Sequence, residues 1–521
     1  MRNLYKFIEW KNWHFFLLFF LLGLTAYINI SAGDFIWDEK TLIIGNEHVH
    51  SLKYFFNWFT ESPTYAEGVE TSNMYRPLAT MAYAVIYSVA GLNTIPYHLV
   101  NIFLHIGNAF LTFVFLQRLG FMRIGSLLAG IVFLLHPIQT ESVSYIAGLP
   151  DVLAPFFMLL GLNIFANNKE LTARRITYIT ILMLCGILSK EIGIIFVPLT
   201  LLIVLFKKED YLKKRKPETI KTLLILSGVT IAYLIFRITA LNTTGTFSLI
   251  GVENLYTENI LYRIYTFFAA GIEYIKMIIY PVHLFFEKPF EAYIYMAPKV
   301  LAGMSVALIG LIFSINSYRK DRHIFFIYFW FAITIALVSG VAFPSNALYK
   351  EHWLYMPLIG IVMLIPCVLE KIRGGTTQKI FIGVICIMSI LSIIKTIDRN
   401  SQWRDAKTFF ENEISYNPTS SRLYNELGMY YYERENWQSA KTNFEKGILL
   451  NKIRLMPELG YNLGNTYLAM GDQASAAQMY RLVLESDPTY LKAHIAMYNL
   501  AKSSDNKEME ALFLKNINRL K

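Results

Sequence analysis

The strongest constraint on this chain is a series of apolar runs that are separated by short basic loops. Of its 521 residues, 55% are hydrophobic and only 17% are charged, whereas soluble globular proteins carry about 25% charged residues. A run of roughly 20 apolar residues can cross a bilayer. The sequence therefore predicts an all-α, polytopic membrane domain of about eleven spans, at residues 13–32, 97–117, 124–138, 151–167, 176–188, 191–207, 221–239, 299–316, 324–341, 353–370 and 378–396.

The formal net charge of +10 is distributed in a way that sets topology. Lys and Arg concentrate in alternate short loops, within residues 2–11, 118–123, 169–175, 207–216, 319–322 and 371–379. Because basic loops remain in the cytoplasm, we expect a cytoplasmic N-terminus and a non-cytoplasmic C-terminal tail. The confinement of the charge to these loops argues against a nucleic-acid partner.

Two predicted external loops are long, the first at about 33–96 and a larger one at about 240–298. Each contains an apolar stretch, 76–92 and 262–284, that would invert all later loops if it were a full crossing. We interpret both stretches as interfacial or re-entrant helices. The three cysteines, Cys185, Cys367 and Cys386, lie inside apolar runs, so no disulfide framework is indicated.

The tail has ordinary soluble composition, which predicts a second domain at 399–521 after a membrane domain at 1–398. It contains a repeat: Leu427-Gly428, Tyr431, Ala440 and Phe444 recur as Leu463-Gly464, Tyr467, Ala476 and Tyr480. This spacing is typical of tetratricopeptide repeats, in which small residues let two antiparallel helices approach and aromatic rings fill the gap. The tail is therefore predicted to form an α-solenoid.

An acidic pair, Asp38-Glu39, follows the first apolar run and the apolar residues Phe35, Ile36 and Trp37. Most loop carboxylates are simply hydrated. A carboxylate just beyond a membrane exit can instead remain ionised and abstract a proton. Asp38 and Glu39 are therefore the candidate catalytic residues.

Several other polar residues are placed on the same predicted external side. Arg76 and Lys190 are candidates for binding a phosphate, although ordinary headgroup contact for Arg76 and an ion pair with Glu191 for Lys190 remain equally open. His98, Asn101, His105 and Asn108 share one helical face, and we favour helix–helix bonding for the last two. The candidates for lining a substrate cavity are His98, His136, Glu141, Asp151, Glu351 and Tyr355, with His352 beside them.

The sequence contains no Walker loop, no Rossmann glycine signature and no G-x-S-x-G elbow. An external active site has no ready supply of nucleotide sugars, so a lipid-carried donor would suit it. His136 and Glu141 do not match a dedicated metal-binding spacing, and we assign no metal ligand. No cofactor is firmly indicated, and assistance by a divalent cation remains open.

Taken in order, these motifs resemble the transmembrane and tetratricopeptide-repeat O-mannosyltransferase family, within the GT-C glycosyltransferase superfamily that includes the protein O-mannosyltransferases. The matching pieces are Trp37-Asp38-Glu39, Tyr75-Arg76-Pro77-Leu78, Gly91-Leu92-Asn93, Tyr97-His98-Leu99-Val100-Asn101, His136-Pro137 with Thr140-Glu141, Ser189-Lys190-Glu191, Glu351 to Pro357, and the repeats. The chain departs from the family at Leu149-Pro150 and His352, where basic residues are usual. Its short tail favours a bacterial or archaeal cytoplasmic membrane over the endoplasmic reticulum.

The resemblance implies an inverting transfer of a sugar, mannose in the known family, from a polyprenyl-phosphate carrier to a protein hydroxyl. Asp38 would act as general base, and Glu39 would orient Asp38 or the acceptor. Arg76, Lys190 and His352 would stabilise the departing phosphate. The repeats would hold the acceptor polypeptide.

Two alternatives compete with this function. One is a transferase of the same superfamily whose acceptor is a glycan or a lipid. The other is a non-enzymatic membrane scaffold that displays tetratricopeptide repeats to partners.

Overall fold

The computed structural model describes residues 11–60, 74–209, 211, 215–239, 255–287, 292–342, 347–372, 375–450 and 456–520. These residues form helices, turns and coil, with no strand among them. The all-α prediction is therefore confirmed for this part of the chain. Parts of the predicted external loops 33–96 and 240–298 lie outside the described residues.

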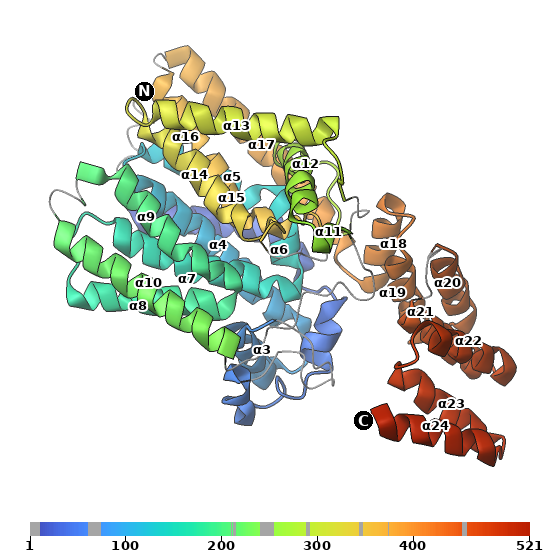
Figure 1. The fold of residues 1–521 in the computed structure, drawn as a ribbon. Helices are drawn as coiled ribbons and strands as arrows, with labels where there is room; N and C mark the ends of the chain where they lie inside the picture. The colour runs from blue at the N-terminus through green and yellow to red at the C-terminus, as the bar shows by residue number, and fades with distance from the viewer. Residues whose placement is uncertain are drawn as a thin grey trace. The chain divides into compact units, whose positions relative to one another are not determined.

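The chain divides into two compact units, one of residues 1–286 and 290–404 and one of residues 287–289 and 405–521. The helices of the first unit (Figure 1) are α2 Asn12–Tyr27, α3 Pro77–Ala90, α4 Thr94–Arg118, α5 Arg123–Leu135, α6 Thr140–Ser144, α7 Leu149–Ala166, α8 Ala173–Ser189, α9 Phe196–Phe206, α10 Lys216–Thr239, α11 Leu255–Glu258, α12 Ile260–Ile279, α13 Pro298–Ser317, α14 Arg322–Ala336, α15 Tyr355–Val362, α16 Leu364–Lys371 and α17 Gly375–Gln402.

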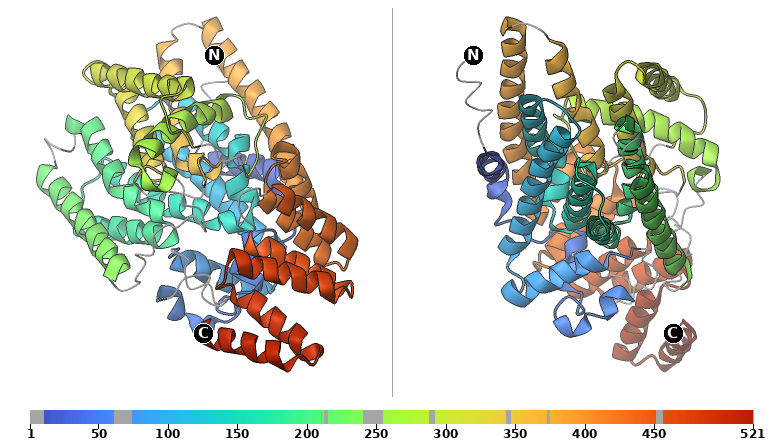
Figure 2. Two further views of the ribbon diagram at one scale, coloured as in Figure 1. Left: turned by 45° about the vertical axis from the view of Figure 1, so that its right-hand side comes forward. Right: turned by 90° about the vertical axis from the view of Figure 1, so that its left-hand side faces the viewer.

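The core of the first unit is built around α4, which packs against α2, α5 and α7. The last helix, α17, returns to lie against α2 and α5, so the two ends of the unit meet (Figure 2). Asn29, just after α2, donates a hydrogen bond of 3.1 Å to the carbonyl of Ile397 on α17. This closure brings the end of α2 and the end of α17 close to each other.

Within the described residues, seven helices are long and apolar enough to cross a membrane, which supports a multi-pass membrane protein. An eighth crossing is obtained if α5 and the bent segment Pro137–Ser144, which turn by 50°, count as one span. The predicted count of eleven is thus not confirmed. Each of the eleven predicted segments contains helix, but short 3-10 helices such as Glu191–Ile195 interrupt apolar runs that look continuous in the sequence.

The described residues of the second unit form seven helices: α18 Ala406–Tyr416, α19 Ser421–Tyr432, α20 Trp437–Leu450, α21 Pro457–Ala469, α22 Gln473–Ser486, α23 Leu491–Ser503 and α24 Lys507–Leu520. A Cβ atom on Gly428 would lie 2.5 Å from the Phe444 ring, and one on Gly464 would lie 2.4 Å from the Tyr480 ring. Helix pairs α19–α20 and α21–α22 therefore use the same glycine–aromatic contact. The packing predicted for the repeat is confirmed at both positions.

We predict that Phe444→Ala destabilises the second unit, because this ring is fully buried against Gly428 and Leu459 belongs to the same core cluster. Removing a buried Phe costs about 3–5 kcal/mol. Limited proteolysis of the full-length protein in detergent should then cleave within 405–521 at least several-fold faster than in the wild type. Leu449→Ala, at a side chain that is 76% exposed, is the control and should leave the rate unchanged. Equal cleavage of all three proteins would contradict this packing.

Candidate active site

The Asp38 side chain is exposed, but buried contacts fix the backbone that carries it. The preceding residue, Trp37, adopts φ +50°, which is unusual for a bulky side chain. Its indole is buried and lies 5.2 Å from the ring of Phe286. The backbone N–H of Asp38 donates a hydrogen bond of 3.1 Å to the Tyr145 hydroxyl. Backbone strain of this kind persists only where the surroundings impose it, and it clusters at functional sites.

Glu39 lies in a very different environment from its neighbour, because its side chain is 1% exposed. One carboxylate oxygen accepts the N–H of Ile36 at 2.7 Å, and the other accepts the N–H of Ala147 at 3.2 Å. Burial raises the pKa of Glu39 to about 8, although the backbone donors act in the opposite direction. Glu39 therefore belongs to the buried hydrogen bonds that fix the loop carrying Asp38. We call these bonds, made by Glu39, Tyr145 and Ala147, the Asp38 frame. Its predicted role in orienting Asp38 stays a prediction.

The segment 145–148, just before α7, collects the hydrogen bonds of this frame. Asn101 on α4 donates to the Tyr145 carbonyl at 2.9 Å, and Tyr83 on α3 donates to the Ile146 carbonyl at 3.1 Å. At Gly148 a Cβ atom would lie 2.5 Å from the carbonyl oxygen of Ser142, so only glycine allows this turn. Two helices, α3 and α4, and the Asp38 loop are thereby fixed to one short segment.

A cluster of opposite charges lies beyond this segment. Lys190 lies 2.5 Å from Asp151, which is in the first turn of α7. Arg76, at the start of α3, uses Nε and one terminal nitrogen on Glu191, at 3.3 and 3.2 Å. Arg237 on α10 lies 3.6 Å from the other oxygen of Glu191. The three cations exceed the two carboxylates by one charge, so the cluster favours an added anion.

A sharp break in the chain creates this cluster. Lys190 is extended between α8 and the short helix Glu191–Ile195. A Cβ atom on Gly193 would lie 2.4 Å from the backbone nitrogen of Ile187, so the turn again requires glycine. The predicted phosphate-binding residues Arg76 and Lys190 are brought together. Lys190 forms an ion pair, with Asp151 rather than with its neighbour Glu191, and it is Arg76 that pairs with Glu191.

His352 belongs to a different cluster. Its Nδ1 lies 2.7 Å from Glu141, and its backbone N–H donates to the same carboxylate at 3.0 Å. The neighbouring Glu351 lies 3.5 Å from Arg399, and both side chains are 1% exposed. His136 is bonded to the carbonyl of Ile278 at 2.9 Å. The three predicted phosphate ligands are therefore divided between two clusters.

Tyr355 and His98, which were predicted to line a substrate cavity, are buried between packed segments of the first unit. The Tyr355 hydroxyl is bonded to His105 at 2.8 Å and to Asn108 at 2.9 Å, and all three side chains are buried. These bonds support the helix–helix interpretation of His105 and Asn108. His98 is also buried, beside the backbone of Gly33, where a Cβ atom would come within 3.1 Å of its Nε2.

Three packed aromatic side chains lie between Lys350, two residues before His352, and the Asp38 loop. Tyr145, Phe286 and Trp403 lie within 6.0 Å of one another by ring centroids. Lys350 lies 3.6 Å above the Phe286 ring and donates to the Phe286 carbonyl at 3.0 Å. Because Phe286 also contacts Trp37, a cation lies one aromatic ring away from the loop that carries Asp38.

Sequence reasoning missed Arg237, Lys350 and Tyr145. Arg237 carried a signal, since it is a basic residue at the predicted external end of span 221–239, against the charge bias. Lys350 directly precedes Glu351 and could have been grouped with it. Tyr145 carried no signal, because its role depends on a hydrogen bond across 107 residues of chain. Among the described residues, no group of three or more His, Cys, Asp or Glu side chains is arranged to hold a metal ion.

The fold and site define a multi-pass membrane protein with a tetratricopeptide domain and an exposed carboxylate beside a cationic cluster. A tetratricopeptide repeat model matches residues 458–490. The chain is 23% identical to protein O-mannosyl-transferase F38B6.6 of Caenorhabditis elegans over 84% of this chain and 62% of that protein. It is 23% identical to protein O-mannosyl-transferase TMTC3 of Mus musculus over 93% of this chain and 58% of that protein.

A shorter region is more similar. Over 151 residues, 28% of this chain and 18% of the relative, it is 34% identical to protein O-mannosyl-transferase TMTC2 of Mus musculus. The predicted resemblance to the transmembrane and tetratricopeptide-repeat O-mannosyltransferase family is therefore confirmed over most of the chain. The chain spans about six tenths of the length of the first two relatives. Among solved structures it resembles ArnT from Cupriavidus metallidurans bound to undecaprenyl phosphate, with 13% identity, coverage of 93% and 80% of the two chains, and a TM-score of 0.37.

We predict that Glu39→Gln changes the pH dependence of stability. Because the folded-state pKa is raised above 4.5, Glu39 contributes stability that is fully present below about pH 4.5 and is lost as pH rises through about 8. The wild-type thermal midpoint should therefore fall more steeply than that of the variant between pH 5 and 8. Intrinsic fluorescence of the detergent-solubilised protein measures both midpoints.

The matched control is Glu47→Gln, which removes an exposed carboxylate from the same loop. It should keep the wild-type slope. Parallel pH profiles for wild type and Glu39→Gln would show that Glu39 has an ordinary pKa in the folded protein.

Proposed function

We propose that this protein is an integral membrane glycosyltransferase that moves a sugar, with mannose the first choice, from a polyprenyl-phosphate carrier to a protein hydroxyl. The observation that carries the proposal is the exposed Asp38 on a strained backbone, whose loop is bonded to Tyr145 and Ala147, four residues before Asp151 of the cationic cluster. The similarity to proteins named as O-mannosyl-transferases supports the choice of sugar and acceptor. We place the reaction on the non-cytoplasmic face, in a bacterial or archaeal cytoplasmic membrane.

In the proposed reaction, a carboxylate oxygen of Asp38 takes the proton of the acceptor hydroxyl. The acceptor oxygen forms a bond to the anomeric carbon of the sugar while the bond from that carbon to the phosphate oxygen breaks. The electron pair of the broken bond stays on the phosphate. Attack from the face opposite the leaving group inverts the anomeric configuration. Phosphate is a weak base, so no general acid is required.

The cationic cluster would receive the phosphate. Arg76 uses only two of its nitrogens on Glu191, and a guanidinium can bind phosphate oxygens through two parallel hydrogen bonds. Lys190 and Arg237 add charge from α8 and α10. The ion pairs with Asp151 and Glu191 hold these cations in position before the donor arrives, so little reorganisation accompanies the developing charge.

The tetratricopeptide domain would bind the acceptor polypeptide. Its repeat helices form a solenoid, and such solenoids present extended concave surfaces to peptides. His352, bonded to Glu141, would act on the phosphate from the other cluster.

We predict that Asp38→Asn abolishes glycosylation of acceptor proteins in cells. Loss of a general base costs about 10²- to 10⁴-fold in rate. Glycopeptide mass spectrometry of cells with the gene deleted and restored as wild type or variant should find sugar-bearing peptides only with the wild type.

Asp34→Asn is the control, since Asp34 is an exposed carboxylate in the same loop. It should restore the glycopeptides. If glycopeptides persist in cells that lack the gene while a polysaccharide or glycolipid is lost, the assignment of a protein as acceptor is contradicted. Full activity of Asp38→Asn at normal protein level would show that Asp38 is not the general base.

We predict that Arg237→Gln weakens use of the lipid-linked donor, because it removes one of the three cations around Glu191. An apparent KM for polyprenyl-phosphate mannose about 5- to 30-fold higher is expected, corresponding to about 1–2 kcal/mol. Lys276→Gln is the control, since this exposed lysine pairs with Glu273 on the same helix. An unchanged KM in Arg237→Gln would show that Arg237 does not contribute to donor binding.

A further inference from the structure

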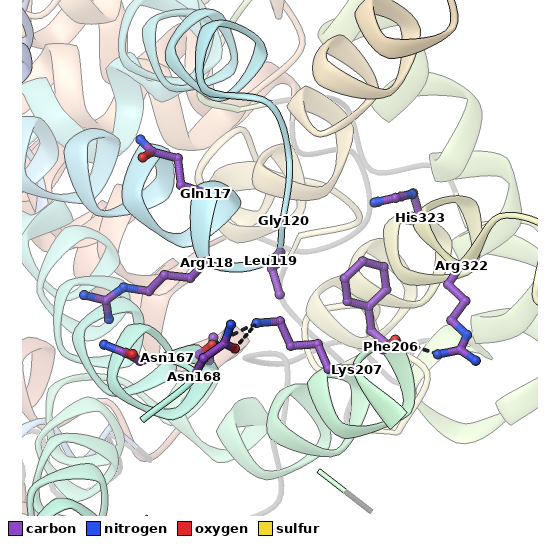
Figure 3. A pocket seen from close by; sticks show the side chains of 11 residues that line it. Gln117, Arg118, Leu119, Gly120, Asn167, Asn168, Phe206, Lys207, Arg322 and His323 are labelled. Carbon is purple, nitrogen blue, oxygen red and sulfur yellow. Dashed lines mark hydrogen bonds between the residues drawn. The ribbon is translucent and has the colours of Figure 1, made fainter. Parts of the chain in front are cut away.

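A polar cavity lies at the end of the first unit that is away from the candidate active site. It measures about 570 Å³ and is formed where α4, α7 and α9 end and α14 begins. Its polar lining, shown in Figure 3, includes Gln117, Arg118, Asn168, Lys207, Arg322 and His323. We refer to this cavity as the basic pocket.

The basic pocket is remote from the candidate active site. On α4, Asn101 contacts the Asp38 frame, and Arg118 lines the basic pocket 17 residues later. At 1.5 Å per residue these positions are about 25 Å apart along the helix. The pocket is formed by the basic loops that the charge bias assigns to the cytoplasmic side. The two sites are therefore expected at opposite membrane surfaces.

Cationic side chains at this end of the unit are bonded to helix-end carbonyls. Arg118 donates to Asn163 and Arg175 to Ile164, both in the last turn of α7. Arg322 donates to the Phe206 carbonyl of α9 at 3.3 Å. Such bonds satisfy carbonyls that have no partner inside the helix.

The carbonyls do not neutralise this charge. A helix C-terminus carries only about half a negative charge. Among the described residues, no carboxylate lies within ion-pair distance of Arg118, Arg175, Arg215 or Arg322. The nearby Asp321 pairs with His323 at 3.0 Å and with Lys371 at 2.8 Å. The pocket thus keeps an excess of positive charge.

Two of the carbonyl-bound arginines, Arg118 and Arg322, line the pocket itself. An anion with several oxygens would supply further acceptors for their guanidinium groups.

We propose that the basic pocket binds the phosphate group of an anionic phospholipid. Basic pockets between membrane helices on the cytoplasmic side are suited to such headgroups. An apolar surface for the acyl chains is available on α9, where Leu201 is 47% exposed and lies about 9 Å along the helix from Lys207. Free phosphate offers the same oxygens but cannot use this apolar surface.

The test measures the thermal midpoint of the purified full-length protein in a non-ionic detergent during titration with phosphatidylglycerol, phosphatidylcholine or inorganic phosphate. Phosphatidylglycerol alone should raise the midpoint with saturation. Arg322→Gln should raise the half-saturating concentration about fivefold, as expected for loss of one cation near a headgroup. Arg322→Lys, which keeps the charge, should lie between the two.

Arg319→Gln is the matched control, since it removes an exposed cation from the same loop outside the pocket lining. It should titrate like the wild type. Equal responses to phosphatidylglycerol and phosphatidylcholine, or equal weakening by Arg319→Gln and Arg322→Gln, would overturn the proposal. An equal midpoint shift with inorganic phosphate would overturn the lipid assignment and indicate a soluble phosphate. If Arg322→Gln does not fold, Arg322→Lys with unchanged titration would also count against the site.

Discussion

The buried carboxylate of Glu39 joins two parts of the chain that are 108 residues apart. It accepts one N–H from its own loop and one from the segment before α7. That segment is in turn held by Asn101 on α4 and Tyr83 on α3. A buried acid is costly unless its oxygens are satisfied, so this arrangement tolerates little displacement. The exposed position of Asp38 depends on it.

The cations of the first unit have different partners in the cationic cluster and at the basic pocket. Near Asp38, cations are paired with carboxylates, as Lys190 is with Asp151 and Arg76 with Glu191. At the basic pocket, arginines are instead bonded to backbone carbonyls. Paired cations stay with their carboxylates and can offer a ligand the donors that the ion pair leaves unused, as Arg76 can with two of its nitrogens on Glu191. Carbonyl-bound cations keep their charge for a ligand. The two ends of the same helices are therefore suited to different roles.

Much of this organisation could be predicted from the sequence, because it depends on local patterns. Apolar runs located the helices, and the 36-residue repeat located the glycine–aromatic contacts at Gly428 and Gly464. The number of crossings could not be predicted, since turns inside apolar runs, such as the one at Gly193, leave hydropathy almost unchanged. The acidic pair was found, but the burial of Glu39 was not. Its partner Ala147 and the ion pair of Arg237 with Glu191 depend on tertiary packing that one sequence does not reveal.

The central claim is that Asp38 removes the proton from an acceptor hydroxyl during transfer from a lipid phosphate. The most direct measurement supplies radiolabelled polyprenyl-phosphate mannose to membranes that contain wild-type protein or Asp38→Asn at equal levels. Label is then followed into protein and lipid fractions. The account predicts label in protein with the wild type and its loss in the variant. Equal label in both would contradict the assignment of Asp38 as the base, and label confined to the lipid fraction would contradict transfer to protein.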